Sequence, residues 1–216
     1  GIKVWSIGSP IGKVGIDVDI DAYMKDVRHV CELAKIFGTT RIRMFSFFHA
    51  YEKREIVMAY LQKMADVAKE YGVELYHENE KDIFGEQAEN CLKIHEAIPE
   101  LKAVFDPANF VQANVDPIKA WDMLKSYVKY LHIKDADETH KNVVAGDGIG
   151  QLGEIMKNFA SQGGGVATLE PHLVSFVGLK ALEEDGKTDK NVGAISFAND
   201  REAFDTDVKA VRNIMA

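Results

Sequence analysis

Cysteine and proline are scarce in this chain, with two and five residues among 216. So little cysteine excludes a disulfide scaffold, and so little proline, with only 17 glycines, excludes a fibrous or low-complexity protein. Long apolar runs are missing as well, because a charge-free stretch such as residues 161–169 is far shorter than a membrane span. We therefore expect a globular protein that has no membrane partner.

Positive charge is also in short supply, since 26 basic residues face 34 acidic ones and give a net charge of −8. Binding along a nucleic acid needs a positive field, so we expect no nucleic-acid partner. The N-terminus shows no charged head followed by an apolar stretch, which argues against a secretory signal. Two lone thiols, Cys31 and Cys91, fit a reducing compartment, and we expect a cytoplasmic protein.

The chain does contain an alternation of short apolar runs and longer segments of helical periodicity. In residues 19–38, for example, Val27, Val30, Ala34 and Phe37 recur at helical spacing, and Gly38 is placed to end the helix. Strand–helix alternation predicts parallel strands. The expected strands are residues 2–7, 40–48, 73–76, 101–105, 129–133 and 166–169. The expected helices are residues 19–38, 51–72, 86–98, 116–128, 151–161 and 201–215.

Acids, amides and histidines stand at the ends of four successive predicted strands. Parallel strands share one carboxyl edge, where α/β enzymes build their sites, so these side chains are expected at one rim. Three carboxylates and an imidazole suit a divalent cation such as Mn²⁺, Mg²⁺, Co²⁺ or Zn²⁺. The rim residues are His77, Glu78 and Asn79; Asp106 and Asn109; His132, Lys134 and Asp135; and Glu170 and His172.

At these positions the sequence resembles the xylose isomerase-like TIM barrels, which include sugar isomerases and epimerases, inositol-catabolism enzymes and endonuclease IV. The matching motifs are GSPIGK at residues 8–13, HEN at 77–79, DPAN at 106–109, LHIKD at 131–135 and LEPH at 169–172. The resemblance implies a (β/α)8 barrel, of which six strand–helix units are visible and the first two are lacking. We accordingly expect a single domain over residues 1–216 that is incomplete at its N-terminus.

The resemblance also implies roles for particular residues. The metal ligands of the family fall on Glu78, Asp106, His132 and Glu170, and the acid and base of its ketose 3-epimerases fall on the two glutamates. Three positions depart from those epimerases: Asn109 replaces a histidine, Phe84 a glutamate and Glu138 an arginine. The metal site therefore transfers, whereas the substrate-binding set of the epimerases does not.

Five polar residues are candidates for substrate binding: Lys13, Asn79, Asn109, Lys134 and His172. Each has an alternative, such as an exposed lysine for Lys13, a structural ion pair for Lys134 and support of the metal ligands for the two asparagines.

Two further features lie in the loop after the strand of His132. Asp135 and Asp137 could form a second-metal pair or could lie in a solvated loop. The glycine-rich segment at residues 146–150 resembles a phosphate loop only superficially, because it does not join a strand directly to a helix.

The sequence thus predicts a sugar isomerase or epimerase that uses a divalent metal, with Mn²⁺ favoured, and no organic cofactor. A glutamate would remove the proton beside the substrate carbonyl, through an enediolate, and a glutamate would return it. Alternatives are a dehydratase or lyase acting on an inositol- or keto-sugar-type substrate, an endonuclease IV-like phosphodiesterase, and a degenerate non-catalytic barrel subunit. The expected partners are a small sugar and, because the first and last strands would have open edges, further copies of the chain in a homo-oligomer.

Overall fold

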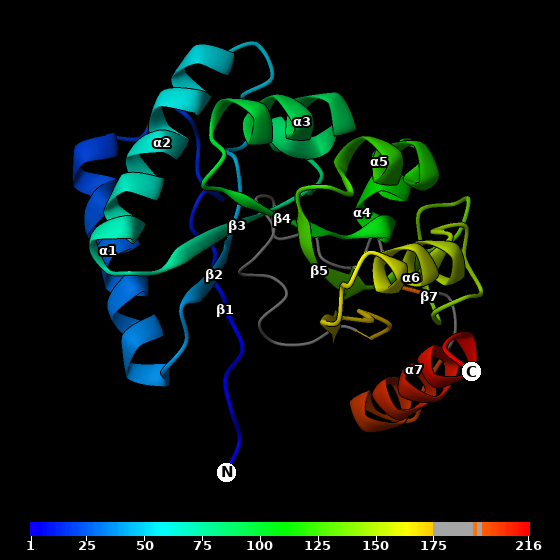
Figure 1. Cartoon of the computed structure of the whole chain (residues 1–216). Coiled ribbons are helices and arrows are strands. Elements are labelled where there is room, and N and C mark those ends of the chain that lie inside the picture. Colours follow the sequence, from blue (N-terminus) through cyan, green and yellow to red (C-terminus); the bar gives the residue numbers. More distant parts are fainter. Residues whose placement is uncertain (175–191, 194–195) are drawn as a thin grey trace. The chain divides into compact units, whose positions relative to one another are not determined.

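The computed structural model describes residues 1–174, 192–193 and 196–216 (Figure 1). Its main sheet has six strands in the order β1-β2-β3-β4-β5-β8, and the pairs β1–β2, β2–β3, β3–β4 and β5–β8 are parallel. The strand order follows the chain, which confirms the predicted α/β fold of the (β/α)8 type with six strands. The strands are β1 (Ile7–Gly8), β2 (Arg41–Met44), β3 (Glu74–Glu78), β4 (Lys102–Phe105), β5 (Val128–Ile133) and β8 (Ala167–Leu169).

The first two strands are shorter than predicted. Residues 2–6 are not in the sheet, and Ile2 is 99% exposed, so an apolar run of β formers was wrongly extended into a strand. In β2 the ladder stops at Met44, and Phe47 adopts a left-handed φ of 68°, which a strand cannot accommodate. The chain therefore turns at the end of β2.

The helices follow the strands as predicted. Helix α1 shows the local reasons: the Asp19 side chain accepts from two amides at its start, and Gly38 ends it at a φ of 69°. Its buried face is Met24, Val27, Cys31 and Ala34, whereas the predicted inward residue Phe37 is exposed. The helices are α1 (Ile20–Phe37), α2 (Arg54–Glu70), a 3-10 turn η1 (Phe84–Glu86), α3 (Ala88–Ala97), α4 (Pro107–Gln112), α5 (Pro117–Leu124), α6 (Leu152–Ser161) and α7 (Asp200–Ile214).

Two elements were not predicted. Helix α4 is a six-residue helix that begins directly after β4, with Asp106 as N-cap and Pro107 in the first turn. The strands β6 (Asp135–Ala136) and β7 (Asn142–Val143) form a small antiparallel pair after β5. Both are too short for hydrophobic periodicity to reveal them.

The chain divides into two compact units, Gly1–Val104 and Phe105–Ala216. In the first unit α1 and α2 pack against each other, and the core gathers side chains of β2, β3 and α2 such as Ile42, Leu61 and Leu75. In the second unit aromatic rings pack edge to face, with Trp121 contacting both Phe105 and Phe159. In the described part of the chain, no helix is both long and apolar enough to span a membrane.

Two histidines are buried in the first unit. His77 in β3 lies against His95 in α3, with ring centroids 5.7 Å apart, and its Nε2 is 3.0 Å from Ser46 Oγ. The Nδ1 of His95 lies 3.2 Å from the carbonyl oxygen of Leu101. Burial lowers the pKa of His77 to about 3 and that of His95 to about 4, so both rings are neutral near pH 7.

We expect the free energy of unfolding to fall as the pH is lowered from about 6.5 toward 4. The unfolded chain binds protons at these histidines near their ordinary pKa, about 6.5, whereas the folded chain does not. Urea unfolding measured between about pH 7 and 4.5 should show that the free energy of unfolding falls by on the order of 2 kcal/mol per histidine.

Replacing His95 (His95→Gln) should remove its part of this pH dependence. The matched control is His29→Gln, because His29 lies exposed on α1 and should leave the dependence as it is. An unchanged dependence in His95→Gln would contradict the assignment of a buried neutral ring.

Candidate metal centre

Asp106 is the most deeply buried of the predicted ligands, with no exposed surface. It directly follows β4 and caps α4, so that its Oδ1 accepts from the amide of Asn109 at 3.0 Å. Its Oδ2 lies 2.9 Å from Nζ of Lys134. The local sequence DPAN therefore fixes one carboxylate oxygen by the helix start and turns the other toward β5.

Lys134 is itself buried and joins two of the predicted site residues. Its Nζ donates to Asn109 Oδ1 at 2.7 Å in addition to pairing with Asp106. A buried ammonium needs such partners, since its desolvation is costly without them. The structure thus brings Asp106, Asn109 and Lys134 together, and the predicted alternative of an ion pair for Lys134 is confirmed.

His132 stands two residues before Lys134 and is buried as well. A carboxylate oxygen of Asp106 and a ring nitrogen of His132 lie within 4.8 Å of each other. Two ligand bonds of about 2.0–2.2 Å span at most about 4.4 Å, so one ion could bind both atoms after a side-chain shift of no more than a few tenths of an ångström. The second unit therefore presents an acid and an imidazole at ligand spacing.

Glu170 directly follows β8 and reaches the same imidazole, because its Oε1 lies 3.5 Å from His132 Nε2. Its backbone amide donates to the carbonyl oxygen of Ile133 at 3.0 Å, which continues the β5–β8 ladder. Its side chain is 33% exposed, and it does not join Asp106 and His132 in the set of mutually close ligand atoms of the described residues. Glu170 thus lies at the rim of the site.

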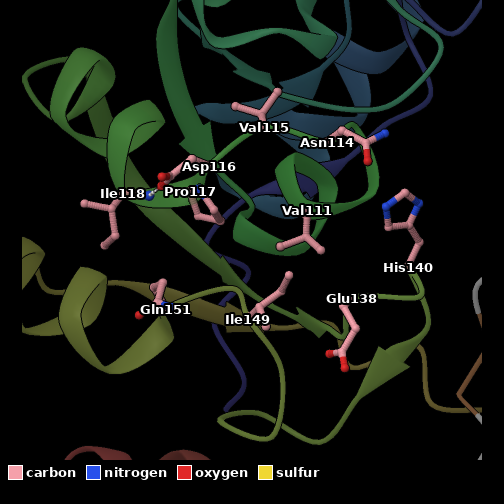
Figure 2. Close-up of a pocket in the computed structure, with 10 residues that line it drawn as sticks. All are labelled: Val111, Asn114, Val115, Asp116, Pro117, Ile118, Glu138, His140, Ile149 and Gln151. Carbon is pink, nitrogen blue, oxygen red and sulfur yellow. Dashed lines mark hydrogen bonds between the residues drawn. The ribbon is translucent and has the colours of Figure 1, made fainter.

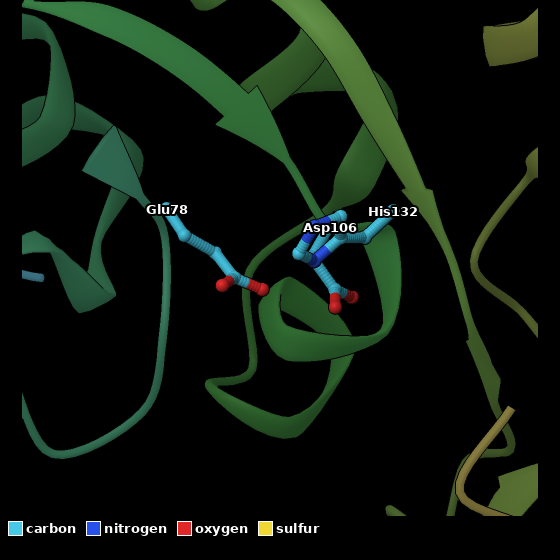
Figure 3. Close-up of side chains that lie close together, drawn as sticks. All are labelled: Glu78, Asp106 and His132. Carbon is cyan, nitrogen blue, oxygen red and sulfur yellow. The ribbon is translucent and has the colours of Figure 1, made fainter. Parts of the chain in front are cut away.

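Glu78 ends β3 in the first unit and is buried there in an ion pair with Arg43, whose Nη1 is 2.8 Å from Oε2. In the β3–β4 ladder Glu78 is the register partner of Val104, and Asp106 is two residues further along the chain. Figure 3 draws the side chains of Glu78, Asp106 and His132, each of which offers one ligand atom.

The other predicted residues have varied surroundings. Lys13 pairs with Glu80 at 3.0 Å, and its Nζ lies 4.5 Å from the centre of the Phe45 ring. Asn79 is buried beside Glu78. His172 is partly exposed with a φ of 46°, and its carbonyl oxygen accepts from Asn142.

Sequence reasoning missed Arg43 and Glu80, the partners of Glu78 and Lys13. A signal for Arg43 was present, because strands of a parallel sheet covered on both faces read as apolar runs. Arg41 and Arg43 interrupt such a run in β2, where they alternate with Ile42 and Met44.

Asp135 and Asp137 do not form a second metal site among the described residues. The Asp135 carboxylate accepts from four backbone amides, and Asp137 Oδ1 accepts from Thr139 and Lys141 in a tight turn. The amides that Asp135 binds belong to Ala136, Gly146, Gly148 and Gly150. The glycine-rich segment therefore binds a carboxylate of its own chain rather than a phosphate.

A cavity of about 520 Å³ lies elsewhere in the second unit (Figure 2). No predicted ligand or substrate-binding residue lines it. The lining residues are Val111, Asn114, Val115, Asp116, Pro117, Ile118, Glu138, His140, Ile149 and Gln151.

Comparison with known proteins agrees with this architecture. Residues 1–192 match the sequence pattern of the family described as xylose isomerase-like TIM barrel. The chain belongs to this family. The resemblance seen in the sequence motifs is thereby confirmed.

Three proteins illustrate the likeness. The IOLI protein, solved with a bound zinc atom, aligns with a TM-score of 0.74 at 13% identity over 99% of this chain and 76% of that one. The 3-keto-D-glucoside 4-epimerase YcjR from Escherichia coli aligns with a TM-score of 0.70 at 13% identity over 99% and 80%. The uncharacterized protein YihM of Escherichia coli K12 is 25% identical over 136 residues, 61% of this chain but only 41% of that protein. This chain therefore spans less than half of that relative.

Asp207, on α7, binds the backbone at the start of the glycine-rich loop. It is buried, and its Oδ1 accepts from the amide of Ala145 at 2.7 Å. Burial, reinforced by the charges of Asp135 and Asp147, raises the pKa of Asp207 to about 6. Between about pH 4 and pH 6 the folded protein therefore keeps a proton on Asp207, whereas the unfolded chain has lost it.

Replacing Asp207 (Asp207→Asn) should stabilise the protein relative to the parent at about pH 7.5 but not at pH 4.5. In the parent, the buried Asp207 carboxylate is charged above its folded pKa, and this charge lowers stability. The variant lacks that charge, and its amide oxygen can still accept from the amide of Ala145. The expected difference between the two pH values is on the order of 2 kcal/mol, measured by urea unfolding.

A suitable control is Asp205→Asn, on the same helix and partly exposed, whose effect should not depend on the burial of a charge. Equal effects of Asp207→Asn at both pH values would show that its carboxylate ionises normally.

Proposed function

We propose that the protein is a sugar isomerase or epimerase that depends on a divalent metal held by Glu78, Asp106, His132 and Glu170. The observation that carries this proposal is the ligand spacing of Asp106 and His132, within 4.8 Å in the buried interior of the second unit. Glu170 joins them through its contact with His132, and Glu78 is included because the HEN motif falls on a ligand position of the family.

The chemistry of the donors fits a metal of the borderline or hard class. Carboxylate oxygens and an imidazole nitrogen suit Mn²⁺, Mg²⁺, Co²⁺ and Zn²⁺, and the sequence analysis favoured Mn²⁺. The structurally similar IOLI protein was solved with a bound zinc atom, which supports metal binding by this chain. When bound, such an ion would polarise a substrate carbonyl and the neighbouring hydroxyl.

The two glutamates are proposed as the catalytic residues. A carboxylate can remove the proton on the carbon beside the carbonyl, and a second can return a proton at the other face or at the next carbon. Arg43 fixes the orientation of Glu78 by their ion pair, and Glu170 at the partly exposed rim can move to meet a sugar.

The remaining polar residues would bind the sugar. Lys134 carries a positive charge beside Asp106, where negative charge on a substrate oxygen would be stabilised. Asn109 and Asn79 supply amides for hydroxyl groups, and Lys13 and His172 would contact the outer part of the substrate. A small sugar is the proposed partner, in agreement with the epimerase name of the structural relative YcjR.

Metal binding is testable without a substrate. Calorimetric titration with Mn²⁺ and Zn²⁺ should show one site per chain, and Asp106→Asn or His132→Gln should each weaken binding by at least about 10–100-fold, the loss known for residues that only support a ligand. Glu138→Gln, a change in an exposed acid outside the proposed ligand set, serves as the control. Wild-type affinity in both ligand variants would refute this metal centre.

Proton transfer is testable in heavy water. A panel of ketoses, aldoses and keto-sugars should reveal a substrate whose carbon beside the carbonyl gains deuterium during turnover. Glu78→Gln and Glu170→Gln should abolish turnover. Lys134→Ala leaves Asp106 without its cation and lowers stability, but the folded fraction of this variant should keep weakened turnover, because no proton passes through the lysine in this scheme.

The outcomes separate the alternatives. Turnover without deuterium incorporation would contradict proton transfer and point to a hydride shift. Loss of water from the substrate would identify a dehydratase. Metal binding with no turnover of any sugar would leave the binding subunit as the function.

A further inference from the structure

Asp135 is a buried carboxylate whose partners are backbone amides rather than a cation. Its Oδ1 accepts from Ala136 and Gly150, each at 2.9 Å, and its Oδ2 from Gly146 at 2.9 Å and Gly148 at 3.2 Å. An ionised carboxylate has about four lone-pair positions, so these four bonds match its capacity. Asp135 therefore binds a loop and offers little to an ion.

The loop is built around this carboxylate. A Cβ on Gly148 would come within 2.3 Å of Asp135 Oδ1, and one on Gly150 within 2.6 Å. Side chains at either position would displace the carboxylate, which explains why glycine recurs in the segment. The loop is also tied to the strand end, because the amide of Ile149 donates to the carbonyl oxygen of Ala136 at 2.8 Å.

The same loop lies beside the chain neighbours of both members of the Lys134–Asp106 ion pair. On one side Asp135 directly follows Lys134 at the end of β5. On the other side Gly150 approaches Pro107, since its Cβ would lie 3.4 Å from Pro107 Cβ, and Pro107 directly follows Asp106. The loop thus lies beside the residue that follows Lys134 and beside the first residue of the helix that Asp106 caps.

We propose that Asp135 is a positioning residue of the metal centre, which holds Lys134 and Asp106 in register through the loop of residues 145–150. The proposal rests on the proposed function, because it is the geometry of that centre that the loop maintains. Asp135 touches neither substrate nor metal in this role. It acts by fixing the backbone on both sides of a buried ion pair.

A comparison within the chain distinguishes this role from ordinary loop stabilisation. Asp137, two residues on, also accepts backbone amides, but they belong to Thr139 and Lys141 in its own turn. Its bonds reach no residue of the centre. Asp137→Asn is therefore a control that makes the same change of charge in the neighbouring turn.

The test uses Asp135→Asn and three measurements on the whole chain. An amide side chain has one oxygen and one donor group, so some of the four backbone amides lose their acceptor. We expect faster hydrogen exchange at Gly146, Gly148 and Gly150, and faster modification of Lys134 by an amine-reactive reagent. We also expect Mn²⁺ affinity to fall by about 10–100-fold, as for residues that orient metal ligands. Asp137→Asn should leave the modification of Lys134 and the Mn²⁺ affinity at wild-type values.

Gly148→Ala is the second variant, because it keeps the charge of Asp135 and disturbs the loop from the other side. It should give the same three changes. If hydrogen exchange rises while Lys134 modification stays at the wild-type rate, the loop does not position the centre and the proposal is wrong. Unfolding of both variants would also overturn it, since Asp135 would then be required by the fold itself.

The measurements separate this proposal from the proposed function. If the wild-type chain binds no Mn²⁺, the metal centre fails, but the reactivity of Lys134 still reports whether Asp135 holds the ion pair. If Mn²⁺ binds with the same affinity in wild type and Asp135→Asn, the metal centre stands and the positioning role is refuted.

Discussion

The buried ion pair between Lys134 and Asp106 is the interaction on which the second unit depends. Neither side chain has appreciable contact with water, and each buried charge would cost several kcal/mol without the other. The pair ties the end of β5 to the start of α4, and Asn109 completes it by accepting from the ammonium. The same two residues stand beside His132 and Glu170, so the interaction that stabilises the unit also shapes the candidate metal centre.

The positions of the site residues were predictable because parallel strands share an edge. Glu78, Asp106, His132 and Glu170 each stand at or near the carboxyl end of a strand, and strand positions follow from hydrophobic pattern. Their partners were not predictable in the same way. Arg43 and Glu78 are 35 residues apart, and Asn109 and Lys134 are 25 apart, so tertiary packing chooses these pairs and no local pattern encodes them.

The partners of the glycine-rich loop were not predictable from the local sequence either. Its sequence placed it in the loop after the strand of His132, but did not reveal that this loop surrounds a carboxylate. Four amides pointing at one carboxylate require that Asp135 be carried to the loop by β5 and β6. Capacity for hydrogen bonds then decides the chemistry. Asp135 has its lone pairs occupied by backbone amides, whereas the carboxylate of Asp106 caps a helix and pairs with the Lys134 ammonium.

Two proposed metal ligands already pair with cationic side chains of the protein. Glu78 is held by Arg43 and Asp106 by Lys134, so each carboxylate is already charge-compensated within its own unit. Like charges repel more strongly in a buried site than in water, so an incoming divalent ion must share these carboxylates with two fixed cations. The metal and the two cations together would give an excess of positive charge. That excess would stabilise the negative oxygen of the enediolate in the proposed reaction. Arg43 and Lys134 would thus weaken the binding of the metal alone and strengthen the binding of the charge that forms only when the substrate reacts.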